Sequence, residues 1–384
     1  VTMIAPLAGF GLTQFHLKVY GVEGWDAHRW LRPSLHFISI TTLVAIVAVV
    51  AWALTGAPDD GTRFSLLVLT PVILSVLAVN LVSNKHRLEN RFGRMALNQM
   101  VIPASRLLVA IGLLLVPRLT DRFVAVSYGA ISLLVALASI PQMRDLFGGK
   151  VALQGYGSPA ATLSHTVVPG VGAVWSEAWA YGVYAALYPV FFQISTILLK
   201  YLSGDADAGI YAIALAVMTA IYLIPATIYQ KFLQGKLHRW AAHDKPKFRH
   251  VYRKGNIAMF VLGLAIAAAM LVVDPWAVHA IFGESYGRVT AILVVLAICV
   301  PIRFLSTSMG SALLTEDNMR FRVYAMALAT LAAVAANVVL IPPYREMGAA
   351  WATVIAETVL LLGTFYGVRR FAGIRRADAD RGGG

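Results

Sequence analysis

The sequence predicts an all-α membrane protein, a polytopic bundle of transmembrane helices arranged in two lobes. Apolar residues make up 59% of the chain and charged residues 13%, and the mean hydropathy is +0.71. These values are too hydrophobic for a soluble domain. The apolar runs are continuous, which indicates helices rather than the alternating strands of a barrel.

Eleven apolar segments can be bracketed, and most are close to the ~20 residues that a helix needs to cross the hydrocarbon layer. Several carry a proline near mid-span, which transmembrane helices tolerate. In chain order the segments are 2–15, 34–56, 64–83, 96–117, 123–141, 173–199, 208–230, 256–273, 289–311, 323–342 and 348–367.

The basic residues fall in alternate gaps between these segments. The gaps that hold 24 of the 32 Lys and Arg residues are 16–33, 84–95, 142–172, 231–255, 312–322 and the tail 368–384. Because Lys and Arg near helix ends are retained on the cytoplasmic side, we expect these gaps and the C-terminus to face the cytoplasm. Inward loops beside anionic lipid also explain the net charge of +13, so no nucleic-acid partner is predicted.

The order of the segments predicts the domain organisation. Residues 143–172 are rich in Gly and Pro, which is typical of a linker, here on the cytoplasmic side. It would separate an N-terminal lobe, 1–142, with five helices from a C-terminal lobe, 173–384, with six helices and a basic tail. Since segment 2–15 would run from outside to inside, we expect one preceding helix to be missing and the complete bundle to have twelve.

Arg106 lies near the midpoint of segment 96–117, about 15 Å from either membrane interface at 1.5 Å per residue. A charge at that depth costs several kcal/mol unless it faces a wet cavity or a partner. Arg106 is therefore a candidate anion-binding residue. Alternatively, it pairs with an acid and fixes helix packing.

Arg303 heads a polar face of segment 289–311 that continues through Ser306 and Thr307. A guanidinium group binds phosphate or pyrophosphate oxygens in bidentate fashion, so an anion site is one interpretation. An ion pair that fixes packing is the other. Glu357, near the middle of the last segment, is expected either to pair with an arginine or to carry a proton or ion.

Tyrosines recur on one face of two neighbouring segments. Rings with hydroxyl groups can stack on sugars and hydrogen-bond to them, so these residues are candidates for lining a saccharide cavity; helix packing or interfacial anchoring explains the same spacing. The candidates are Tyr181, Tyr184, Tyr188, Tyr211 and Tyr222, together with Thr307.

The inward loop 231–255 alternates basic with apolar residues. It is either an ordinary positive-inside loop or an amphipathic helix on the cytoplasmic leaflet, with rings such as Phe248 and Tyr252 among the acyl chains.

Enzyme signatures are weak. Asp205-Ala206-Asp207 matches the D-x-D pattern of glycosyltransferases but lies in a short outward gap, where two turn aspartates are the better account. No zinc-protease, Walker A or nucleophile-elbow motif is present, and the histidines lack metal-ligand spacing. We expect no enzyme activity, cofactor or metal.

Several stretches of the second half resemble a known family. They are Ala208–Ala212 with Ile224-Pro225, the loop Ile281–Tyr286, and the run from Asn337 through Ile341-Pro342 to Gly348, Thr353 and Glu357. These stretches are similar to the Wzx-type O-antigen flippases of the MATE-like multidrug, oligosaccharidyl-lipid and polysaccharide exporter superfamily. The resemblance is best over 173–367. Arg345 departs from it, since the family usually has glycine in this outward turn.

The resemblance implies a bacterial inner-membrane transporter that flips an undecaprenyl-pyrophosphate-linked oligosaccharide by alternating access, with proton or ion coupling. Membrane lipid, the lipid-linked glycan and other polysaccharide-assembly proteins would be its partners. Arg303 and Arg106 would hold the pyrophosphate, the tyrosines would contact sugar, and Glu357 would balance charge or carry a proton.

Three alternatives remain open. A drug or cation antiporter of the same superfamily would call for a cavity dominated by carboxylates, whereas the mid-membrane charges are two Arg and one Glu. A membrane-embedded polysaccharide polymerase or ligase would need a sizeable outward loop. A peptidoglycan-precursor flippase fits the same features.

Overall fold

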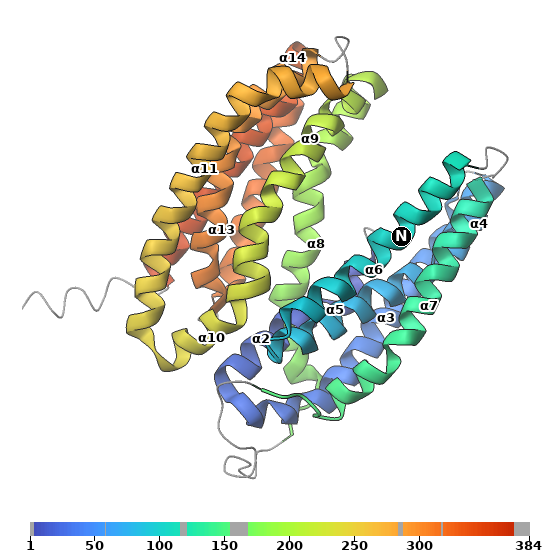
Figure 1. The fold of residues 1–384 in the computed structure, drawn as a ribbon, viewed down its shortest axis with the longest axis vertical. Coiled ribbons are helices and arrows are strands. Elements are labelled where there is room, and N and C mark those ends of the chain that lie inside the picture. The colour runs from blue at the N-terminus through green and yellow to red at the C-terminus, as the bar shows by residue number, and fades with distance from the viewer. Residues whose placement is uncertain are drawn as a thin grey trace, which may run out of the picture. The chain divides into compact units, whose positions relative to one another are not determined.

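The computed structural model describes residues 4–57, 59–115, 121–153, 168–282, 287–315 and 318–371. The regular structure in these ranges is helical, which confirms the predicted all-α class. The chain forms two compact units, Val1–Ala186 and Leu187–Gly384 (Figure 1).

The first unit begins with a broken helix. The predicted segment 2–15 is not continuous, because Phe10 and Gly11 have φ angles of +32° and +76° and separate α1 (Ala5–Gly9) from α2 (Leu12–Glu23). A side chain at Gly11 would collide with the backbone of Tyr181 and Gly182. Glycine at this position therefore permits both the left-handed turn and the close approach of another helix.

The remaining helices of the first unit follow the other predicted segments. A short 3₁₀ helix, η1 (Gly24–Trp30), leads into α3 (Leu31–Thr55). Segment 64–83 is split into α4 (Asp60–Val68), which Asp59 caps through the backbone N–H of Thr62 at 2.7 Å, and α5 (Pro71–Leu88), which starts with proline. Helices α6 (Phe92–Leu115) and α7 (Asp121–Phe147) both pack on α5.

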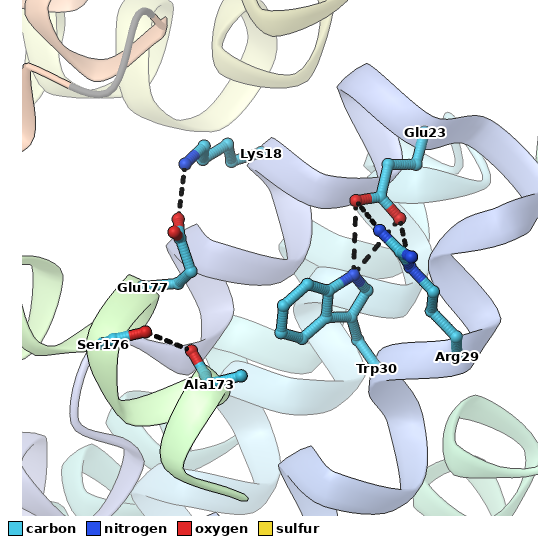
Figure 2. Close-up of polar contacts among 7 residues, drawn as sticks. All are labelled: Lys18, Glu23, Arg29, Trp30, Ala173, Ser176 and Glu177. Atoms are coloured by element: carbon cyan, nitrogen blue, oxygen red, sulfur yellow. Dashed lines mark hydrogen bonds and ion pairs between the residues drawn. The ribbon is translucent and has the colours of Figure 1, made fainter. Parts of the chain in front are cut away.

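Helix α8 (Val171–Leu202) starts in the first unit and ends in the second. Its first turns are fixed to α2 and to the α1–α2 junction. Trp175 stacks on Phe10 with ring centroids 5.2 Å apart. Lys18 Nζ lies 2.9 Å from Glu177 Oε2, and this ion pair is drawn in Figure 2. The boundary between the two compact units, at Leu187, thus falls inside α8. The division into lobes 1–142 and 173–384 stays a prediction.

The second unit continues with α9 (Asp205–Ala226), a π-helical turn η3 (Thr227–Leu233), α10 (Gln234–His243) and α11 (Lys245–Phe282). Helix α13 (Cys299–Thr315) follows α12 (Gly287–Ala297) and packs against α11 and α14 (Met319–Phe371). Helix α14 contains two predicted segments, 323–342 and 348–367, joined at an elbow where Arg345 has φ +50° and ψ −128°.

Length and composition support the membrane prediction. Within the described ranges, eight helices are long and apolar enough to cross a membrane, and nine if α12 and α13, bent by 42°, form one span. One of the eight, Met319–Arg370, is 52 residues long and includes the elbow. Large side chains such as Leu108, Val272 and Leu331 are exposed on these helices, as expected for surfaces that face lipid.

Loop 231–255 is ordered as the helical corner between α10 and α11. Phe248 and Tyr252 are 3% and 6% exposed and stack on each other with centroids 6.2 Å apart. Of the two interpretations of this loop, the one that places these two rings among acyl chains is therefore wrong for Phe248 and Tyr252. Packing inside the protein removes the same apolar surface from water.

Candidate functional site: a buried arginine–glutamate pair

Arg303 and Glu357 form a buried ion pair inside the second unit. Nη1 of Arg303 lies 3.0 Å from Oε1 and 3.3 Å from Oε2 of Glu357, and the two residues are 4% and 1% exposed. Arg303 comes from α13 and Glu357 from the second arm of α14. The two mid-span charges that the sequence singled out in this half of the chain thus meet.

Aromatic side chains surround the guanidinium group. Nη2 donates a hydrogen bond to the hydroxyl oxygen of Tyr188 at 2.6 Å, and Cζ lies 5.1 Å from the Tyr188 ring and 5.3 Å from the Tyr222 ring. Phe191 and Phe192 are at 5.9 and 6.0 Å. Each such contact contributes ~0.5–2 kcal/mol of cation–π attraction when desolvated.

The energetics of this arrangement point to a role beyond packing. Removing an ion from water costs several kcal/mol, which the attraction between partners repays only with good geometry and further hydrogen bonds. Here the carboxylate and Tyr188 supply both. Because apolar residues of similar volume would hold the helices together at least as well, a charged pair in a membrane span is a functional candidate.

A small cavity of about 20 Å³, enough for one water molecule, lies beside Glu357. Hydroxyl groups of Ser195 and Thr353 line it together with Phe192 and Tyr222. Ser195 and Thr353 hydrogen-bond to each other at 3.2 Å, and Asn337 donates to Ser195 at 3.0 Å. Glu357 therefore has a water-sized space next to it, lined mostly by apolar side chains and by a few hydroxyl-bearing residues, as well as its arginine.

Arg106 belongs to the first unit and has a different environment. It is half-buried on α6, and its Cζ lies 5.4 Å from the Tyr128 ring on α7. Arg106 is thus the less enclosed of the two arginines.

The other predicted residues fall into three groups. Tyr188 and Tyr222 lie against Arg303, as described above. Tyr211 is 1% exposed and hydrogen-bonds to Thr353 at 2.7 Å, while Tyr181 is 3% exposed in the first unit beside Gly11. Tyr184 and Thr307 are half-buried.

A second ion cluster was missed by sequence reasoning. Arg288 at the start of α12 donates to Asp207 through Nη2 and to Glu346 through Nε, both at 2.7 Å, and the two acids are 5% and 7% exposed. Asp207 lies in the first turn of α9. The three residues come from three different gaps that the sequence predicts on the outward side. Their opposite charges on the same side of the membrane were the one sequence signal for this cluster.

Among the residues that the structure describes, no group of three or more His, Cys, Asp or Glu side chains could hold a metal ion.

The chain is similar over nearly its whole length to several solved transporters. It matches an outward-facing multidrug resistance MATE family transporter of the MOP superfamily with TM-score 0.71 and 13% identity, covering 97% of this chain and 85% of the other. The fold is that of MATE-like transporters. The lipid II flippase MurJ in an inward closed conformation matches with TM-score 0.62 and 14% identity, covering 95% of this chain and 80% of the other.

A third MATE-like structure is a MOP superfamily transporter from Pyrococcus furiosus, described as having a binding pocket of reverse polarity. It gives TM-score 0.71 at 14% identity, covering 98% of this chain and 86% of the other. Identities this low establish the shared fold alone. No protein-family model and no curated protein matches the chain.

Proposed function

We propose that this chain is a membrane transporter that moves a polyprenyl-pyrophosphate-linked oligosaccharide between leaflets by alternating access. The observation that carries the proposal is the buried guanidinium group of Arg303, set among hydroxyl-bearing rings inside a membrane helix. The MATE-like fold, which this chain shares with a lipid II flippase, supports transport as the class of activity.

The chemistry of the pair suits an anion that arrives and leaves. In the structure Glu357 neutralises Arg303, so the cation is not left unpaired in the membrane. A pyrophosphate could replace the carboxylate because both present oxygen pairs that match the guanidinium fork. Tyr188 and Tyr222 would keep the guanidinium group in place during the exchange.

Glu357 then has two proposed roles. Displaced from Arg303, its carboxylate would be costly to keep charged, so uptake of a proton or a cation would accompany binding of the anion. The cavity beside Glu357 leaves space for water to deliver that proton. Arg106 in the first unit is the second candidate for anion binding, and Tyr181, Tyr184, Tyr211 and Thr307 remain candidates for sugar contacts.

The test is leaflet-resolved transport of a polyprenyl-pyrophosphate oligosaccharide in vesicles. We expect Arg303→Ala to slow transport at least tenfold, since one charge-assisted contact to a phosphate contributes about 1.5–3 kcal/mol. Arg303→Lys keeps the charge but loses the forked guanidinium group, so its transport rate should fall between those of the wild type and Arg303→Ala. Arg106→Ala tests the first unit in the same assay. Normal transport by both alanine variants would end the anion-site proposal.

A drug or cation antiporter is the second candidate, and one observation favours it. The carboxylate of Glu357 lies at a cavity lined by aromatic rings, an environment that organic cations prefer. Against it, Arg303 already neutralises that carboxylate. Transport of an organic cation that Glu357→Gln abolishes and Arg303→Ala leaves intact would favour the antiporter.

The proposed setting is a bacterial inner membrane with the C-terminus in the cytoplasm. Other polysaccharide-assembly proteins are proposed partners. Labelling of single cysteines placed in predicted inward and outward gaps tests the orientation.

A further inference from the structure

We propose that the corner between α10 and α11 is a binding surface for the headgroups of anionic phospholipids in the cytoplasmic leaflet. The basic corner comprises five exposed cations: Lys236, Lys245, Lys247, Arg253 and Lys254. This inference is independent of the transported substrate and depends only on the predicted orientation.

The position of the basic corner fixes it at headgroup depth. It joins two candidate membrane spans, Asp205–His243 and Lys245–Val273 (Figure 1). One and two turns beyond Lys254, Ile257 and Val261 are 66% and 58% exposed, which is expected of side chains that face acyl chains. Cations one helical turn from the lipid-facing surface reach the phosphate layer.

Packing turns the cations outward. On α10, Leu237 and Ala241 are 2% and 7% exposed and belong to the core of the second unit, and α10 packs against α13. Lys236, which precedes Leu237 on the same helix, is exposed. Phe232, in the preceding π-helical turn, is 43% exposed and adds an apolar side chain at the same end of the unit. An exposed ring beside lysines is typical of a membrane interface.

The cations of the corner form no ion pair with an acidic side chain in the part of the chain that the structure describes. Among the described residues, no acidic side chain pairs with Lys236, Lys245 or Lys247; Lys247 instead lies over the Trp240 ring with Nζ 5.1 Å from its centroid. Asp244 is the one acid in 231–255, and it accepts the backbone N–H of Lys247 at 3.1 Å. The corner therefore keeps a net positive charge that an anionic partner would neutralise.

The helix dipole strengthens this conclusion. Lys245 and Lys247 lie in the first turn of α11, where the carboxylate of Asp244, which precedes the helix, is the one nearby anion for two cations. A helix N-terminus carries about half a positive charge, so cations there are repelled unless an anion is near. Phosphate groups of the leaflet would relieve both the repulsion among the lysines and the repulsion by the dipole.

The experiment compares the lipid retained by purified protein after reconstitution into nanodiscs that contain equal phosphatidylglycerol and phosphatidylcholine. Retained lipid is counted by native mass spectrometry at low and high salt. We expect the wild-type chain to prefer phosphatidylglycerol about tenfold, with the preference falling as salt rises because exposed charges are screened.

The test variant carries Lys236→Gln, Lys245→Gln and Lys247→Gln, and should lose most of that preference. The matched control removes three exposed cations from predicted outward gaps, Arg63→Gln, Arg122→Gln and Lys200→Gln, and should keep it. Lysine-to-arginine changes at the three test positions should also keep it, which separates charge from folding.

The proposal is overturned if the test variant retains phosphatidylglycerol with the same preference as the wild type. It is also overturned if the control variant loses that preference as much as the test variant does. A wild-type preference that is absent, or unchanged by salt, overturns it without any variant.

Discussion

Arg303 and Glu357 are 54 residues apart in the sequence, and the structure brings their side chains to 3.0 Å. Each could be singled out from sequence, because a charge in the middle of an apolar segment is costly and therefore informative. An ion pair was one interpretation of each residue, but the sequence could not identify the partner, since periodicity identifies a helix face but not the helix that it meets. For the same reason, the sequence placed Tyr188 and Tyr222 on polar faces without indicating that both lie against Arg303.

The first prediction concerns the stability of the pair. Arg303→Met should lower the free energy of unfolding by about 3–5 kcal/mol, because it leaves Glu357 buried without its partner. The double variant Arg303→Met with Glu357→Gln should be more stable than Arg303→Met alone. Chemical unfolding in detergent measures both.

Arg106→Met is the control for this comparison. Arg106 is half-buried against Tyr128, so its loss should cost about 1 kcal/mol. A double variant less stable than the single Arg303→Met variant would contradict the interpretation of Arg303 and Glu357 as a mutually dependent pair.

At the scale of elements, the sequence located most helices but not their breaks. The break at Phe10 and Gly11 and the elbow at Arg345 occur at residues with positive φ. Contacts between helices surround these residues, and such contacts cannot be predicted from local sequence. Arg345 departs from the glycine that the resembled family usually has. Its left-handed φ supplies the physical reason why glycine suits the position.

The second prediction follows from that elbow. Arg345→Gly should raise the free energy of unfolding by about 1 kcal/mol, because glycine adopts this backbone conformation without strain. Arg345→Ala removes the same charge but retains a Cβ, so it should give no such gain. If alanine stabilised the protein as much as glycine, charge rather than backbone strain would be the cause.

The third prediction concerns the cluster that joins α9, α12 and α14. Arg288→Gln should destabilise the chain by about 1–2 kcal/mol, because it leaves the buried acids Asp207 and Glu346 without their cation. The loss is limited to this size because Arg288 itself is half-exposed and its charge is screened by solvent. Lys200→Gln breaks the exposed pair with Asp205 and should change stability by less than about 0.5 kcal/mol. Thermal unfolding in detergent compares the two, and equal effects would contradict the prediction.

At the scale of the whole molecule, the fold class was predictable from two local properties. The length of each apolar segment indicates a membrane-spanning helix, and the number of basic residues in each gap indicates the side of the membrane that it faces. The division of the chain at Leu187 was not, because the first turns of α8 pack on the first unit through Trp175 and Glu177. The amino-acid composition of a helix does not determine which neighbouring helix its end packs against.

The fourth prediction is that transport depends on pH through Glu357. Wild-type transport should change with pH because the proposed exchange transfers a proton to the displaced carboxylate. Glu357→Gln cannot titrate, so its transport rate, whatever its size, should be flat across the same range. A pH profile unchanged by this substitution would remove the proposed proton role and leave the anion site standing.

The central claim is that the transported group is an anion attached to lipid. The most direct measurement loads the same reconstituted vesicles with either a polyprenyl-pyrophosphate oligosaccharide or an organic dye cation and follows both across the membrane. We predict that the lipid-linked sugar moves and that Arg303→Ala slows it at least tenfold, while the cation does not move. Transport of the cation alone, at a rate that depends on Glu357 and not on Arg303, would contradict the claim.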